Sequence, residues 1–146
     1  MKKGHSNPLL LDVNVLFAIA WPNHQFHAAA LRRLESSRVS WATCALTELG
    51  FIRLSSSPAA VPSPKSPAEA AMMLASMTRD PLHVYFGSLP SPVRSPEAFQ
   101  RILGSKQVTD VYLLSLARRH DATFLTFDSK LNGLADPETR VEVLGT

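Results

Sequence analysis

The hydrophobic positions of the chain form short runs that alternate with helical patterns. Leu9–Leu11 is a continuous apolar run, which is typical of a strand buried on both faces of a parallel sheet. Similar short runs, rich in apolar and β-branched residues, recur along the chain between polar or turn-forming residues. We expect strands at residues 9–11, 39–43, 82–86, 122–127 and 141–144.

Between the expected strands, apolar residues recur at spacings of three and four, as in amphipathic helices. Thr43 is expected to cap the third helix, and Ser66, followed by Pro67 and Glu69, is expected to cap the fourth after a proline-rich loop at 55–67. The expected helices span residues 13–20, 24–36, 44–54, 67–77, 96–103 and 107–120. Strands that alternate with helices predict an α/β fold with a mainly parallel central sheet covered on both faces.

Length and composition favour a single domain over residues 1–146, with 45% hydrophobic residues to form its core. The net charge of +3 suits a polyanionic partner but is equally common in other soluble proteins. Cys44 is the only cysteine, which excludes an internal disulfide or a cysteine-cluster metal site. The polar start MKKGHSNP does not look like a secretion signal, and the apolar stretch 9–21 is shorter than the roughly 20 residues that span a bilayer. We therefore expect a cytoplasmic protein without membrane contact.

Four of the twelve acidic residues stand where carboxylates are unusual. Asp12 ends the apolar run 9–11, and Asp128 follows the apolar segment ATFLTF. Glu48 and Asp110 lie on the expected helices with apolar residues three and four positions away, which predicts that both point inward. An isolated buried carboxylate costs several kcal/mol. One of these acids alone could be a helix cap or half of an ion pair, but four together predict a shared site.

The carboxyl ends of parallel strands meet at one edge of the sheet, where ligands bind. Asp12 and Asp128 are expected at that edge, and Glu48 and Asp110 near the starts of helices that begin there. Converging carboxylates repel one another unless cations lie between them, and oxygen ligands without histidine or cysteine spacing favour Mg²⁺, with Mn²⁺ as a substitute. Such ions bind phosphodiesters and activate water. The pattern therefore predicts a metal-dependent nuclease.

Four segments together resemble the PIN-domain ribonucleases, most closely the VapC-type toxins of bacterial VapBC toxin-antitoxin systems. They are LDVNVLFAIAWPNH at 11–24, WATCALTELGFIRLSSSP at 41–58, QVTDVYLLSLARRH at 107–120 and LTFDSKL at 125–131. The resemblance covers nearly the whole chain and is weakest from residue 55 to residue 96. It implies a PIN-like three-layer α/β/α sandwich and an endoribonuclease that acts on transfer, ribosomal or messenger RNA.

The resemblance also implies roles for particular residues. Asp12, Glu48, Asp110 and Asp128 would form the catalytic quartet, and Asp12 and Asp110 would bind the ions most directly. Two polar residues, Asn14 and Thr126, would orient Asp12 or a water, and with Arg53 they are our candidate substrate contacts. Arg53 could instead meet the antitoxin.

The implied partners are a second copy of the chain and a VapB-type antitoxin whose tail packs over the active site. Operator DNA would be contacted only through that antitoxin. Two other interpretations remain open from the sequence. One is a non-catalytic RNA-binding or regulatory module, which a cleavage assay distinguishes. The other is an aspartate-nucleophile phosphatase, which requires a second aspartate where this chain has Asn14.

Overall fold

A five-stranded sheet with the order β3-β2-β1-β4-β5 forms the centre of the protein, and every pairing between neighbouring strands is parallel. The strands are β1 (Leu9–Leu11), β2 (Trp41–Cys44), β3 (His83–Phe86), β4 (Thr123–Thr126) and β5 (Arg140–Val143). The α-helices are α1 (Val13–Ala20), α2 (His27–Ser37), α3 (Ala45–Ser55), α4 (Pro67–Met77) and α5 (Val108–Arg119). Short 3-10 helices cover Pro92–Arg94, Pro96–Phe99 and Ser129–Gly133.

The computed structural model describes residues 7–145. Residues 1–6 and 146 of the expected domain, and with them most of the segment MKKGHSNP, lie outside the described part. Within residues 7–145, no helix has both the length and the apolar character needed to cross a membrane.

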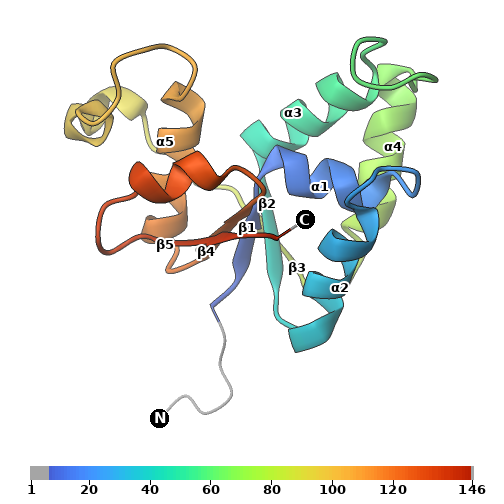
Figure 1. The fold of residues 1–146 in the computed structure, drawn as a ribbon, viewed down its shortest axis with the longest axis horizontal. Helices are drawn as coiled ribbons and strands as arrows, with labels where there is room; N and C mark the ends of the chain where they lie inside the picture. The colour runs from blue at the N-terminus through green and yellow to red at the C-terminus, as the bar shows by residue number, and fades with distance from the viewer. Residues whose placement is uncertain (1–6, 146) are drawn as a thin grey trace.

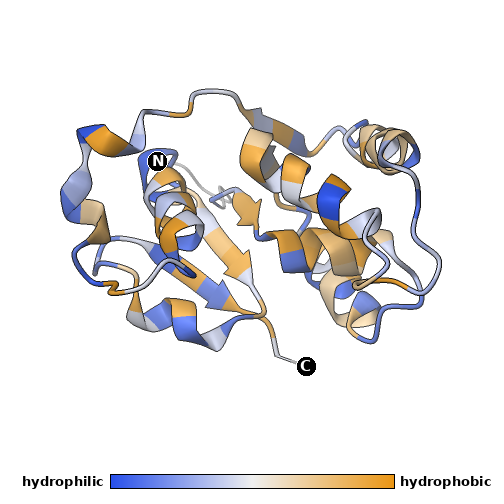
Figure 2. Ribbon diagram, turned by 90° about the horizontal axis from the view of Figure 1, so that it is seen from above, coloured by the Kyte–Doolittle hydropathy of each residue, from blue (hydrophilic) through white to orange (hydrophobic). Residues whose placement is uncertain are grey.

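Helices lie on both sides of the sheet (Figure 1), and each side has its own hydrophobic cluster. Leu9 and Leu11 point towards α1–α4, whereas Leu10 points towards α5. Figure 2 shows hydrophobic central strands between helices of mixed polarity, as expected for a sheet that is covered on both faces. The predicted α/β/α sandwich is therefore confirmed, and the sheet is parallel throughout.

Most of the predicted helices and strands are present, with boundaries that are either identical or differ by at most three residues. The helix predicted at 96–103 was wrong, because only a 3-10 turn at Pro96–Phe99 forms there. The predicted N-cap Thr43 was also wrong. Cys44 takes that position, and its backbone N–H donates to Thr47 Oγ1 at 3.0 Å. The cap predicted at Ser66 is confirmed by reciprocal bonds with Glu69.

Two contacts fix the positions of helices: one joins α3 to α1, and the other joins α2 to the edge strand β5. Gly50 of α3 lies against Val13, the first residue of α1, so closely that a Cβ atom at Gly50 would be 2.6 Å from Val13 Cγ2. On the edge strand β5, Glu142 accepts two hydrogen bonds from Arg33 of α2, at 2.6 and 2.9 Å. These contacts hold α3 against α1 and α2 against β5.

Candidate active site

The carboxyl edge of the sheet brings Asp12 and Asp128 together. The strand order reverses between β1 and its neighbour β4, which leaves the crevice where ligands of parallel sheets bind. Asp12 directly follows β1, and its N–H donates to Leu125 O of β4 at 2.9 Å. Asp128 lies just beyond the end of β4. The prediction that both aspartates stand at this edge is confirmed.

Asp12 is held by two hydrogen bonds to its carboxylate. It is the N-cap of α1, where Oδ1 accepts from Val13 N at 2.7 Å, and Oδ2 accepts from Thr126 Oγ1 at 2.7 Å. Only 8% of Asp12 is exposed. A carboxylate has about four lone pairs, so two remain for a ligand. Asp12 therefore caps a helix and can still bind a cation.

Thr126 is the centre of a small polar network behind Asp12. Its Oγ1 accepts from Asp128 N at 3.0 Å and from Asn14 Nδ2 at 3.4 Å, while Asn14 Oδ1 accepts from Phe127 N at 3.3 Å. Thr126 is fully buried, which directs its hydroxyl to the protein rather than to a substrate. The geometry thus supports the predicted role of Asn14 and Thr126 as residues that orient Asp12.

Three of the four predicted acids interact electrostatically. The pKa of Asp12 is raised to about 6, mainly by burial and to a lesser extent by the negative charges of Asp110 and Asp128, against the lowering effect of its two hydrogen bonds. The pKa of Asp110 is raised by its burial and by the charge of Asp128. Carboxylates that raise each other's pKa in this way would be stabilised by a cation bound between them.

Glu48 is held separately, in the first turn of α3. Its Oε2 accepts a 2.8 Å hydrogen bond from Thr43 Oγ1, and Thr43 Oγ1 lies 2.8 Å from His83 Nε2. Glu48 and Asp110 are both half-buried, so they do not point into the core as predicted. Arg53 is exposed in the last turn of α3.

The acids do not form a closed metal cage. Within residues 7–145, no three Asp, Glu, His or Cys side chains are placed to hold one ion together. Mg²⁺ does not need such a cage, because it commonly takes one or two carboxylates and keeps several waters. The carboxylate donors, two of them with raised pKa values, fit an ion of this kind.

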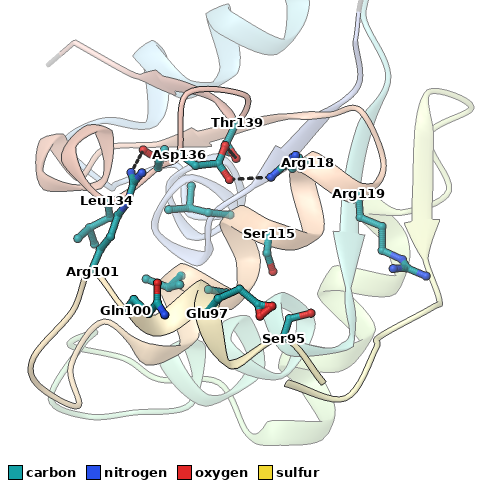
Figure 3. Close-up of a pocket in the computed structure, with 14 residues that line it drawn as sticks. Ser95, Glu97, Gln100, Arg101, Ser115, Arg118, Arg119, Leu134, Asp136 and Thr139 are labelled. Carbon is teal, nitrogen blue, oxygen red and sulfur yellow. Dashed lines mark hydrogen bonds and ion pairs between the residues drawn. The ribbon is translucent and has the colours of Figure 1, made fainter. Parts of the chain in front are cut away.

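A hollow of about 610 Å³ lies elsewhere, between α5, the 3-10 turn at Pro96–Phe99 and residues 134–139 (Figure 3). Arg118 in its wall donates to Asp136 Oδ2 at 2.9 Å, and Arg119 points away from this pair. None of the four acids lines this hollow. Its polar groups therefore add nothing to the site at the edge of the sheet.

The family model described as "PIN domain" matches residues 9–137 of the chain. The chain belongs to the PIN-domain family. Two curated relatives of the chain are ribonucleases VapC38 and VapC44 of Mycobacterium tuberculosis. VapC38 is 40% identical and covers 92% of this chain and 96% of its own, and VapC44 is 39% identical and covers 94% and 97%. The predicted VapC-type membership is confirmed.

Solved structures agree with this PIN fold. VapBC2 from Rickettsia felis, bound to a DNA fragment from its promoter, has a TM-score of 0.64 at 14% identity, covering 94% of this chain and 98% of its own. VapC20 of Mycobacterium tuberculosis, described as a sarcin-ricin loop cleaving toxin, also has a TM-score of 0.64 at 14% identity, covering 90% and 98%. At this identity the likeness concerns the fold alone.

Sequence reasoning missed the hydrogen bond of Thr43 to Glu48 and the contact of Thr43 with His83. Thr43 was interpreted as a helix cap, and no motif surrounds His83. Their contact depends on how β3 lies beside β2, where His83 pairs with Trp41 and Tyr85 with Thr43. The register between two neighbouring strands cannot be read from the sequence of either strand alone.

Proposed function

We propose that this VapC-family endoribonuclease toxin cleaves RNA with Mg²⁺ held by Asp12 and Asp110. Membership of the family confirms the expectation of an endoribonuclease toxin. The observation that carries the metal proposal is the buried carboxylate of Asp12, whose pKa is raised to about 6 mainly by burial and further by the charges of Asp110 and Asp128. Such a group gains most from a cation that replaces its proton.

The residues around Asp12 fit this role. Thr126 and Val13 each occupy one lone pair of the Asp12 carboxylate and fix its direction, which leaves the remaining lone pairs for the ion. Asp110 stands in the first turn of α5 with a raised pKa and is the second ligand. When bound, Mg²⁺ would neutralise the phosphodiester charge and lower the pKa of a water. Mn²⁺ would substitute for it.

The other two acids have supporting roles in this proposal. Asp128, whose backbone N–H is bonded to Thr126, adds negative charge beside Asp12 and Asp110. Glu48 lies in the first turn of α3, where Thr43 holds one of its oxygens. It would orient the attacking water or accept its proton. The expected products carry a 5′-phosphate and a 3′-hydroxyl.

The proposed substrate is a transfer, ribosomal or messenger RNA. Arg53 is exposed on α3 and is the proposed contact for a substrate phosphate. The charge on Arg53 would act mainly on RNA affinity, since phosphate contacts position the chain without reading sequence.

The proposed protein partners are a VapB-type antitoxin and a second copy of this chain. Support for the antitoxin comes from the VapBC2 structure, which its description gives as bound to promoter DNA. Contact with operator DNA would occur only through the antitoxin. Co-expression with a candidate VapB-type antitoxin and light scattering of the purified proteins would test both partners.

The decisive experiment compares the wild type with Asp110→Asn on total bacterial RNA, with and without Mg²⁺, and maps the new ends. Asp110→Asn should lower cleavage more than about a hundredfold, beyond the usual effect of losing an outer ligand contact, while the circular dichroism spectrum is unchanged. Glu35→Gln, at an exposed position of α2, is the matched control and should cleave normally. Undiminished cleavage by Asp110→Asn, or in excess chelator, would exclude the proposal.

The same assay tests the non-catalytic alternative. An RNA-binding module would retain RNA on a filter but produce no new ends with either ion. No contact in the described residues favours that alternative over cleavage.

A further inference from the structure

We propose that His83, acting through the hydroxyl of Thr43, is a positioning residue for Glu48. The inference rests on the proposed function, in which Glu48 acts on the attacking water. It adds a chain of two hydrogen bonds that begins on the edge strand β3, crosses β2 and ends on α3.

The direction of each hydrogen bond follows from the proton count. Thr43 Oγ1 has one proton and donates it to Glu48 Oε2 at 2.8 Å, because an ionised carboxylate can only accept. The same oxygen must then accept from its other neighbour, His83 Nε2, also at 2.8 Å. His83 therefore carries a hydrogen on Nε2. An imidazole with its hydrogen only on Nδ1 would leave Nε2 and Oγ1 as two facing acceptors.

The surroundings hold His83 in this orientation. Its ring packs against that of Trp41 with centroids 4.7 Å apart, and Trp41 Nε1 donates to Asp80 Oδ2 at 2.9 Å. The backbone N–H of His83 donates to Asp80 O at 2.9 Å. Asp80 thus fixes both the partner ring and the start of β3. The histidine is placed before any ligand arrives.

The chain of bonds gives Glu48 a defined direction. Thr43 is fully buried, so no solvent competes for its hydroxyl. Oε2 of Glu48 is occupied by Thr43, whereas Oε1 accepts no hydrogen bond from residues 7–145 and remains available for the water of the proposed reaction. A free glutamate in the first turn of a helix would sample several rotamers. The Thr43 bond selects one of them, and His83 orients the Thr43 hydroxyl.

Kinetics of four variants test this role on a fluorescent oligoribonucleotide that contains a cleavage site mapped in total RNA. Thr43→Val and His83→Leu should each lower kcat about tenfold and leave KM within about twofold, as expected when an outer hydrogen bond to an active group is lost. Thr43→Ser keeps the hydroxyl, and the amide nitrogen of His83→Gln reaches about as far as Nε2. Both should restore most of kcat.

Two controls separate positioning from folding. Val84→Thr, at an exposed position of the same strand, should keep wild-type kcat. The double variant Thr43→Val/His83→Leu should be no slower than the slower single variant, because both changes break one chain of bonds. Independent, multiplying losses would contradict the chain, as would full kcat in Thr43→Val.

A nuclear magnetic resonance experiment tests the hydrogen bond from His83 to Thr43 without an activity assay. Burial lowers the pKa of His83, so the ring is neutral at pH 7.5, although Glu48 and Asp80 act in the opposite direction. Long-range ¹H–¹⁵N correlation should show the hydrogen on Nε2 in the wild type, with the signals assigned by their loss in His83→Gln. A hydrogen on Nδ1 would overturn the proposal even if His83→Leu fails to fold.

The two proposals fail in different ways. If the wild type cleaves no RNA, the proposed function is wrong, and the nitrogen spectrum still decides whether the chain of bonds exists. If the wild type cleaves RNA and His83→Leu is folded and equally fast, the role of His83 is wrong and the nuclease remains.

Discussion

The hydroxyl of Thr126 donates a 2.7 Å hydrogen bond to Oδ2 of Asp12, 114 positions away in the sequence. The bond joins the ends of β4 and β1 and lies entirely within the protein. Thr126→Val keeps the shape of the side chain but removes this donor and the acceptor for Asp128 N. We expect a loss of about 1–3 kcal/mol in the free energy of unfolding, measured with urea at pH 7.

The control for this prediction is Thr126→Ser, which keeps the hydroxyl and should lose much less stability. A Thr126→Val protein as stable as the wild type would mean that the Asp12–Thr126 bond contributes no net stability. In that case its role would be confined to the direction of the Asp12 carboxylate.

Protonation of Asp12 should make stability depend on pH. Its pKa is about 6 in the folded protein, mainly because of burial, and about 3.9 in an unfolded chain. Between these values the folded state binds more protons, so the free energy of unfolding falls as pH rises through this window. From pH 5 to pH 7.5, in chelator, this effect should lower wild-type stability by about 1 kcal/mol relative to Asp12→Asn.

Urea unfolding of both proteins at the two pH values measures that difference. The comparison between variants removes the contributions of the other titrating groups. A difference that stays constant from pH 5 to pH 7.5 would show that the Asp12 carboxyl has an ordinary pKa, and would weaken the case for a cation site.

Divalent ions should stabilise the folded protein. A ligand that binds only the native state at about ten times its dissociation constant adds about 1.4 kcal/mol, or a few degrees in Tm for a domain of this size. We expect millimolar Mg²⁺ to raise Tm at pH 7.5 and to do so less at pH 5.5, where protons compete for Asp12. Calorimetry measures the shift.

Two comparisons make the Mg²⁺ experiment specific. Asp110→Asn should lose the shift, and KCl at equal ionic strength should not reproduce it. If Mg²⁺ leaves the wild-type Tm unchanged at pH 7.5, the acids do not bind the ion in the absence of RNA, and the ligand roles of Asp12 and Asp110 would need a bound substrate.

The Arg33–Glu142 pair should stabilise the edge strand β5 only slightly. The pair is bidentate, but its side chains are 24% and 36% exposed, so water and salt screen it. Arg33→Met should lower the free energy of unfolding by about 1 kcal/mol or less, with a smaller effect at high salt. Arg32→Met, exposed on the same helix, is the control and should change stability less.

The sequence predicts the order of strands and helices well, because the buried run Leu9–Leu11 and its counterparts are short and strongly apolar. It also predicts that Asp12 and Asp128 meet, since parallel strands share one carboxyl edge. It overestimates the helix at 96–103, where the structure has only a 3-10 turn at Pro96–Phe99. The spacing of apolar residues alone does not show whether the backbone of a short segment will form α-helical hydrogen bonds.

The half-burial of Glu48 and the contact of Thr43 with His83 could not be predicted from the sequence. Spacing along α3 places Glu48 beside core residues, but in the first turn of the helix its carboxylate instead accepts a hydrogen bond from Thr43. The histidine reaches Thr43 from the neighbouring strand, and that depends on the pairing of β3 with β2. These features arise from packing between elements.

Gly50 and Val13 lie between the two helices that carry Glu48 and Asp12. Because a methyl group at position 50 would overlap Val13, the close packing of α1 against α3 requires a residue without a side chain at position 50. A larger residue at either position would push the helices apart and with them the two acids. The positions are therefore expected to covary among homologues: a side chain can be gained at 50 only when one is reduced at 13.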